Sequence, residues 1–255
     1  MKFIYTPGRL RVNSNQIGFS AKDIDAICAI GSSTKADEKH SAQFIGEKGI
    51  GFKSVFRIAN KVWLSSRNYS IRWDREAQLG AMTPEWASFP ESLEDGETIF
   101  LAELIRDEQQ VQIVDDLENF DASLILFLTK IRRVDIEVHG DGGKRWTKSV
   151  TRRDIEEIDY RISVLQDGQE QLSYLKSAFT AASLPRESRR HRASTSELVL
   201  AFPLQQDSNN TPPTNTAYVC SGLPIGNYGL KVSGYTQRTT KPETQHNPTK
   251  SLCKV

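Results

Sequence analysis

The residues with the clearest chemical potential form a glycine-rich stretch, FIGEKGIGFKSVF, from Phe44 to Phe56. Its glycines stand at positions 46, 49 and 51, and an apolar run follows directly. Glycine lacks a Cβ, so its backbone can adopt positive φ and approach a ligand closely. Where such a loop leads into a helix, unpaired N–H groups and the helix dipole together form an anion site. The stretch is therefore either a phosphate-binding loop or a tight structural turn.

The spacing of the glycines matches neither of two common phosphate-binding motifs. A P-loop needs Lys and then Ser or Thr directly after its last glycine, whereas Phe52 follows Gly51 here. A dinucleotide-binding fingerprint reads G-x-G-x-x-G after a strand, and this stretch reads G-x-x-G-x-G after a polar loop. Spacing alone leaves the kind of anion open.

Composition excludes several other classes of protein. The 255 residues include 33 Lys and Arg against 32 Asp and Glu, a difference of 33 − 32 = +1, so no global field attracts nucleic acid or an anionic membrane. No run approaches the length of a membrane span, and the first ten residues lack the apolar core of a signal peptide. We expect a protein of the cytoplasm or nucleus with no membrane partner.

Two further groups of residues favour structural interpretations. Cys28, Cys220 and Cys253 show no CxxC spacing, which argues against a disulfide framework and against a zinc site. The basic run RESRRHR over 186–192 has no interleaved aromatic residues to stack on bases, so it indicates a solvated loop more than a nucleic-acid contact.

Local patterns predict the elements that would position the glycines. Ser20 is a good helix N-cap, and Asp23 stands at the spacing of a capping box. Apolar periodicity and turn residues predict, in chain order, a hairpin over 3–15, helices over 20–31 and 52–60, a hairpin over 61–74, a strand over 94–104, a helix over 109–130, a strand–turn–strand unit over 133–153 and a strand over 196–204.

Taken with its neighbours, the glycine stretch resembles the Bergerat-fold ATPases, the superfamily of gyrase B, the ninety-kilodalton heat-shock chaperone, histidine kinases and MutL. The chain looks most similar to the sacsin-like and No Vein-like branch. The blocks GFS, DIDAICAIG, STK and GEKGIGFKSVF follow in the order of that branch, and GETIFL, FDASLILFLTKIRRVDIEV and LPIGNYGLK also resemble its segments. The likeness spans residues 3–231.

The resemblance implies a binding site for ATP or ADP, with Mg²⁺ in the intact family. It places an adenine-side turn at Asn15 to Gly18, a mobile lid in the STK block, the phosphates in the glycine stretch and a threonine behind the adenine. The implied nucleotide contacts are Asn15, Gly18, Ser33, Thr34, Lys35, Gly46, Lys48, Gly49, Ile50, Gly51, Phe52 and Thr98.

The resemblance also implies an α+β fold. Residues 1–130 would form a two-layer α/β sandwich with a mixed, mainly antiparallel sheet, residues 131–231 a second α+β region, and residues 232–255 a disordered tail. The family's first helix carries an acidic general base and a Mg²⁺-binding Asn, and it should precede the strand that starts near residue 3. We therefore expect a chain truncated at its N-terminus and assign no catalytic residue and no metal ligand.

The expected function is ATP or ADP binding by a module that does not hydrolyse the nucleotide alone. In a complete protein, nucleotide would order the lid and switch contacts with other domains or proteins. One alternative is a nucleotide-free interaction or scaffold fragment with a purely structural glycine loop. Another is a chromatin- or nucleic-acid-associated factor that resembles the MORC-type ATPases.

Overall fold

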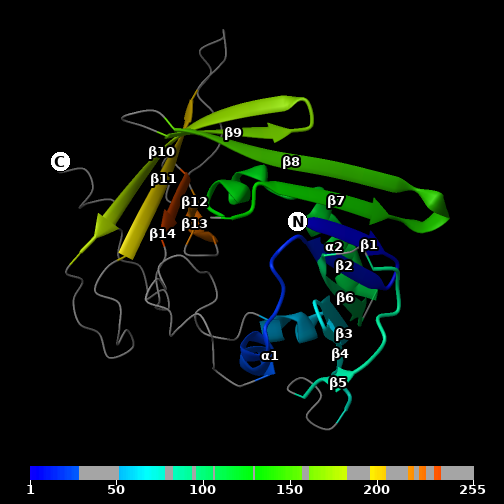
Figure 1. The fold of residues 1–255 in the computed structure, drawn as a ribbon. Helices are drawn as coiled ribbons and strands as arrows, with labels where there is room; N and C mark the ends of the chain where they lie inside the picture. Colours follow the sequence, from blue (N-terminus) through cyan, green and yellow to red (C-terminus); the bar gives the residue numbers. More distant parts are fainter. Residues whose placement is uncertain are drawn as a thin grey trace.

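The computed structural model describes residues 1–28, 52–77, 83–93, 96–105, 107–128, 130–156, 161–182, 196–204, 218–220, 224–227 and 233–236. Strands dominate this part of the chain (Figure 1). They are β1 (Lys2–Thr6), β2 (Arg9–Ser14), β3 (Ala59–Ser66), β4 (Tyr69–Asp74), β5 (Glu85–Trp86), β6 (Thr98–Leu104), β7 (Arg133–His139), β8 (Arg145–Glu156), β9 (Arg161–Asp167), β10 (Glu170–Ala181), β11 (Ser196–Leu204), β12 (Tyr218–Cys220), β13 (Pro224–Asn227) and β14 (Ser233–Thr236).

The helical segments in the described ranges are few and short. Two are α-helices and three are 3₁₀ segments: α1 (Ala21–Cys28), α2 (Asp107–Glu118), η3 (Phe52–Arg57), η4 (Ala122–Leu126) and η5 (Asp141–Gly143). Helix α1 begins as the sequence predicts, because Ser20 and Asp23 form a reciprocal capping box. The Ser20 N–H donates to Asp23 Oδ2 at 2.9 Å, and the Asp23 N–H donates to Ser20 Oγ at 3.4 Å.

All fourteen described strands belong to one sheet, in the order β13-β12-β14-β11-β10-β9-β8-β7-β1-β2-β6-β3-β4-β5. Neighbouring strands pair antiparallel except β1 with β7 and β12 with β14, which pair parallel. The parallel pair of β1 with β7 joins the strands before residue 105 to the strands after residue 132, and in it Phe3 lies opposite Ile136. In Figure 1 the long green strands β7 and β8 run from this junction toward β9, β10 and β11.

The expected two-layer α/β sandwich with a separate second α+β region is therefore wrong. Strands from residues 1–130 and from residues 131–231 hydrogen-bond into a single sheet, and helices cover only part of it. The physical reason is that β7 pairs with the open edge of β1, and β8 to β10 then extend the sheet by consecutive hairpins. The division into domains stays a prediction. β14 lies within the range expected to form a disordered tail, and residues 237–255 are outside the described part.

Two predicted helices differ in kind from the observed elements. The segment after the glycine stretch forms the 3₁₀ segment η3 rather than an α-helix, and β3 follows almost at once. The helix expected over 109–130 is divided into α2 and η4. Asp121 causes the second start, because its carboxylate accepts a hydrogen bond from the Ser123 N–H at 2.9 Å. The two predicted hairpins, over 3–15 and 61–74, are confirmed.

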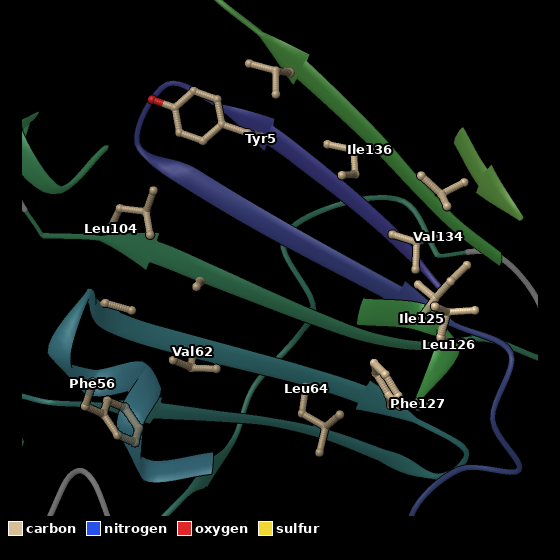
Figure 2. Close-up of a cluster of buried hydrophobic side chains, with 14 of the residues drawn as sticks. Tyr5, Phe56, Val62, Leu64, Leu104, Ile125, Leu126, Phe127, Val134 and Ile136 are labelled. Atoms are coloured by element: carbon tan, nitrogen blue, oxygen red, sulfur yellow. The ribbon is translucent and has the colours of Figure 1, made fainter. Parts of the chain in front are cut away.

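A hydrophobic core lies on one face of β1, β7, β6, β3 and β4 (Figure 2). Strand alternation points Val62, Leu64 and Trp73 to this face, and Leu64 and Trp73 are fully buried. Phe56 of η3 and Ile125 of η4 belong to the same core cluster, with η3 packed against β3 and η4 against β8 and β9. Full burial of one large apolar side chain stabilises a fold by roughly 1.5–3 kcal/mol, so this face is a major source of stability.

Candidate functional site

A buried pair of hydroxyl groups links two regions that the sequence analysis assigned to nucleotide binding. Ser66, the last residue of β3, lies 2.8 Å from Thr98, the first residue of β6, between their hydroxyl oxygens. The Ser66 hydroxyl also accepts a hydrogen bond from the Phe19 N–H at 2.9 Å. Both hydroxyl side chains are 1% exposed, so these bonds satisfy groups that water does not reach. The residues after the predicted adenine-side turn are thereby tied to Thr98.

Gly18 approaches the end of the β3–β4 hairpin so closely that no side chain fits there. Its φ is +94°, and a Cβ at this position would lie 2.7 Å from Arg67 Cγ and 3.0 Å from Ser66 Oγ. Arg67 in turn donates from Nε to the carbonyl of Ile17 at 2.7 Å. Both the positive φ and the close approach require glycine at position 18.

Phe52, the first described residue after the last glycine of the stretch, packs in an aromatic cluster. Its ring lies 4.9 Å from that of Trp73 and 5.8 Å from that of Phe100, between ring centroids. Phe19 packs edge-on against Phe100 at 5.8 Å, and Phe52 meets Phe56 edge-on at 6.1 Å. Aromatic contacts of this geometry add roughly 0.5–1.5 kcal/mol each beyond area burial. The exit of the glycine stretch is therefore anchored beside the residue that follows Gly18.

Lys53 ties the two chain ends that flank residues 29–51. Its ammonium donates to the carbonyl of Cys28 at 3.2 Å, at the C-terminus of α1, where the helix dipole favours a cation. Lys53 thus has a structural partner at the end of α1. The pKa of the Cys28 thiol is raised, chiefly because burial disfavours the thiolate, although Trp73 and Lys53 act in the opposite direction.

Polar groups line the opposite face of β2. Asn13 is 3% exposed, donates to Glu97 Oε2 at 2.7 Å, and accepts from Arg11 Nε at 2.8 Å. Arg11 also pairs with Glu91 at 3.1 Å. Ser14 points the other way, and its hydroxyl donates to the Thr98 carbonyl at 3.4 Å. These bonds fix the strand that leads into the turn at 15–18, for which an adenine-side role is predicted.

Four of the predicted nucleotide contacts fall in the described ranges: Asn15, Gly18, Phe52 and Thr98. Ser66 brings Gly18 and Thr98 together. Phe52 is connected to this turn through Phe100, which contacts both Phe52 and Phe19. Asn15 is solvent-exposed. Ser33, Thr34, Lys35, Gly46, Lys48, Gly49, Ile50 and Gly51 lie outside the described residues, and their roles stay predictions.

Sequence reasoning missed Ser66 and Arg67. One signal was available: Arg67 and Asn68 form the two-residue loop between β3 and β4, and Ser66 faces Tyr69 across the hairpin end. The contact of this loop with residues 17–19 had no local signal, because it joins positions almost fifty residues apart.

The described ranges contain no group of three or more His, Cys, Asp or Glu side chains that could hold a metal ion. They also contain no helix that is both long and apolar enough to cross a membrane.

Comparison with known proteins gives one partial relationship. No model of a protein family matches the chain. The chain is 39% identical over 85 residues to the protein NO VEIN of Arabidopsis thaliana, a match that covers 33% of this chain and 3% of that protein. The chain therefore spans a small fraction of the relative's length. The predicted No Vein-like relationship is supported over that stretch.

Proposed function

We propose that this chain binds an adenine nucleotide, ATP or ADP, between the Ile17–Phe19 turn and the glycine stretch at 46–51. One observation carries the proposal: Gly18 and Thr98, which the resemblance assigns to the same nucleotide from distant positions, lie side by side through Ser66.

The chemistry of the flanking groups suits such a ligand. Gly18 carries no side chain, so the turn presents only backbone at that residue. The aromatic rings of Phe19 and Phe52 make the surroundings apolar. Lys53 donates to the Cys28 carbonyl and so brings together the two described residues that flank the segment containing the glycines. When bound, the nucleotide would supply phosphate oxygens that accept hydrogen bonds from backbone N–H groups of the glycine stretch.

Thr98 has a supporting role in this proposal. The Thr98 side chain is 1% exposed and does not face solvent. Its hydroxyl bonds to that of Ser66, which in turn accepts from the Phe19 N–H. The proposal concerns binding alone. Mg²⁺ belongs to it only as a companion of the phosphates, since no metal ligand is assigned in the chain.

Calorimetry with ADP and Mg²⁺ tests the proposal on wild type, Gly49→Ala and Gly51→Ala. Loss of a few charge–dipole contacts of roughly 0.3–1 kcal/mol each should weaken ADP affinity by about tenfold in each variant. Gly140→Ala is the matched control, because Gly140 has φ of −89° and an added Cβ meets only ordinary contacts at 3.7 Å or more. It should bind like wild type.

The possible outcomes separate the functions under consideration. Absence of binding heat and of any thermal shift at millimolar nucleotide contradicts the proposal and favours a nucleotide-free interaction fragment. Equal losses in Gly140→Ala and Gly51→Ala would indicate a general effect of glycine replacement and would also count against the proposal.

A further inference from the structure

Arg67 adopts a backbone conformation that its residue type rarely takes. Its φ is +52°, and it is the one residue other than glycine with positive φ in the described part of the chain. It occupies the first position of the two-residue loop between β3 and β4, where positive φ favours glycine, asparagine or aspartate. Such strain persists where the surrounding contacts over-determine it, and it often marks a functional element.

The side chain of Arg67 reaches the turn that carries Gly18. Its Nε donates to the Ile17 carbonyl at 2.7 Å. Its Cγ lies only 2.7 Å from the point that a Cβ of residue 18 would occupy. The adjacent residue, Ser66, accepts from the Phe19 N–H at 2.9 Å. Two consecutive hairpin residues therefore hold three consecutive turn residues by two hydrogen bonds and one close packing contact.

Among the described residues, hydrophobic packing holds the Phe19 end of this turn, where the Phe19 ring lies edge-on against Phe100 at 5.8 Å, and contributes little at Ile17. The Ile17 side chain is 84% exposed, and Asn15 and Gln16 are exposed as well. An exposed turn with few apolar contacts opens locally unless specific bonds restrain it. Among the described contacts, Ser66 holds the Phe19 end of the turn, and Arg67 holds Ile17 and Gly18.

We infer that Arg67 is a positioning residue for the nucleotide site: it fixes the Ile17–Phe19 turn in the conformation that the ligand requires. The identity of the ligand rests on the proposed function, and the position of Arg67 rests on its contacts with Ile17 and Gly18. An ordered turn removes the entropy that would otherwise be lost when nucleotide binds. Loss of Arg67 should therefore weaken binding although Arg67 itself need not contact the nucleotide.

The test uses substitutions that remove the guanidinium without adding backbone strain. Arg67→Gly and Arg67→Asn both tolerate positive φ, so the hairpin should fold, with an unchanged midpoint of urea unfolding. We expect the Phe19 amide to exchange with deuterium about tenfold faster and ADP affinity to fall about fivefold, consistent with the loss of one charge-assisted hydrogen bond. Arg67→Lys keeps the stem and the positive charge, and it should restore part of both effects.

Arg75→Ala is the control for charge, because Arg75 is an exposed cation just beyond the far end of β4. It should leave amide exchange at Phe19 and ADP affinity unchanged. If Arg67→Gly and Arg67→Asn bind ADP like wild type with Phe19 equally protected, the inference is overturned. A loss of affinity that only parallels a loss of global stability would show a merely structural role and would also overturn it.

Failure of this inference and failure of the proposed function give different results. If wild type binds no ADP, the nucleotide proposal fails and the binding part of this inference fails with it. Hydrogen exchange in the absence of nucleotide still tests the geometric part: faster exchange at Phe19 in Arg67→Gly supports the restraint, and unchanged exchange contradicts it.

Discussion

The two parts of the sheet hold their helical segments by different interactions. Over β1, β6, β3 and β4, apolar side chains and neutral polar groups predominate: Ser66 with Thr98, and Gln109 donating to the carbonyl of Arg57 at 3.2 Å. Over β8 and β10, cations donate to the carbonyls of the segment that includes η4. Lys148 donates to Phe120, Arg152 to Ile125 and Lys176 to Leu126.

The difference follows from what each part of the sheet offers. The first part presents dense apolar rows, so helical segments dock there by burial, which is non-directional. The strands β8 and β10 carry long cationic side chains that reach backbone carbonyls just before η4 and at its end. Charge-assisted hydrogen bonds contribute roughly 1.5–3 kcal/mol and also fix direction. Burial thus supplies most of the stability, and the cations set the orientation of η4 against the sheet.

The largest effect should come from the apolar part. Leu64→Ala removes a side chain that is 0% exposed in the centre of β3. We expect a loss of about 2–5 kcal/mol in the free energy of unfolding, because transfer and cavity terms add. Urea titration measures it, and Leu93→Ala, at a side chain that is 51% exposed, should change stability by less than about 0.5 kcal/mol. Similar losses in the two variants would contradict this assignment of the core.

The cationic part should show a smaller loss from a single change. Arg152 is 5% exposed, donates to the Ile125 carbonyl and pairs with Asp154 at 3.3 Å. Arg152→Met removes this bond and leaves the Ile125 carbonyl with the Leu128 N–H at 3.4 Å, while Asp154 keeps Arg132 at 3.3 Å, so we expect a loss of about 1–3 kcal/mol.

Arg153→Met is the matched control, since Arg153 is exposed on the neighbouring position of β8. The comparison of the two regions fails if Arg152→Met is as stable as this control, or if it costs more than Leu64→Ala.

At the Ile17–Phe19 turn, the backbone conformation of Gly18 should determine how much a substitution changes the stability. Gly18→Ala forces a Cβ into a residue with φ of +94° and against Arg67, which should destabilise the fold by about 1–2 kcal/mol. Gly140→Ala, at negative φ, should be neutral or stabilising by about 0.4–1 kcal/mol because it restricts the unfolded chain. Thermal unfolding of both variants gives the sign, and a stable Gly18→Ala would contradict the close approach.

The smallest effect should be seen at the junction of the two regions and should depend on pH. The pKa of Glu137 lies below its ordinary value of 4.5, first because Lys2 donates to it and further because Arg145 and His139 lie nearby. A lowered carboxyl pKa gives stability that is fully present above pH 4.5 and is lost as pH falls through the folded-state pKa. Glu137→Gln should therefore approach wild-type stability on acidification. A stability difference that stays constant from neutral to acidic pH would contradict this.

Much of the local structure could be predicted from the sequence. Ser20 and Asp23 specify the start of α1 because capping depends only on residues three apart, and the hairpin over 61–74 follows from alternation on both sides of a short turn. The helix over 52–60 was assigned to the wrong class, because a short apolar periodicity suits a 3₁₀ turn as well as an α-helix.

The candidate site was predictable only residue by residue. Gly18 and Thr98 were recognised separately, whereas Ser66 and Arg67, which connect them to one another and to Ile17, were not. Their side chains are ordinary ones for a hairpin end. Their importance comes from the unusual φ of Arg67 and from contacts across almost fifty residues, and neither has a local pattern.

The sequence by itself determined where turns, caps and alternating apolar faces occur, because these depend on neighbouring side chains and on backbone restrictions of single residues. Only the tertiary structure decided that β7 pairs with β1 and joins both halves in one sheet, that cations hold η4, and that Arg67 restrains the turn at Gly18. The physical reason is that backbone N–H and C=O groups are the same in every strand. Which strand edges meet is therefore set by the combined packing of the whole chain, and no short stretch of sequence encodes it.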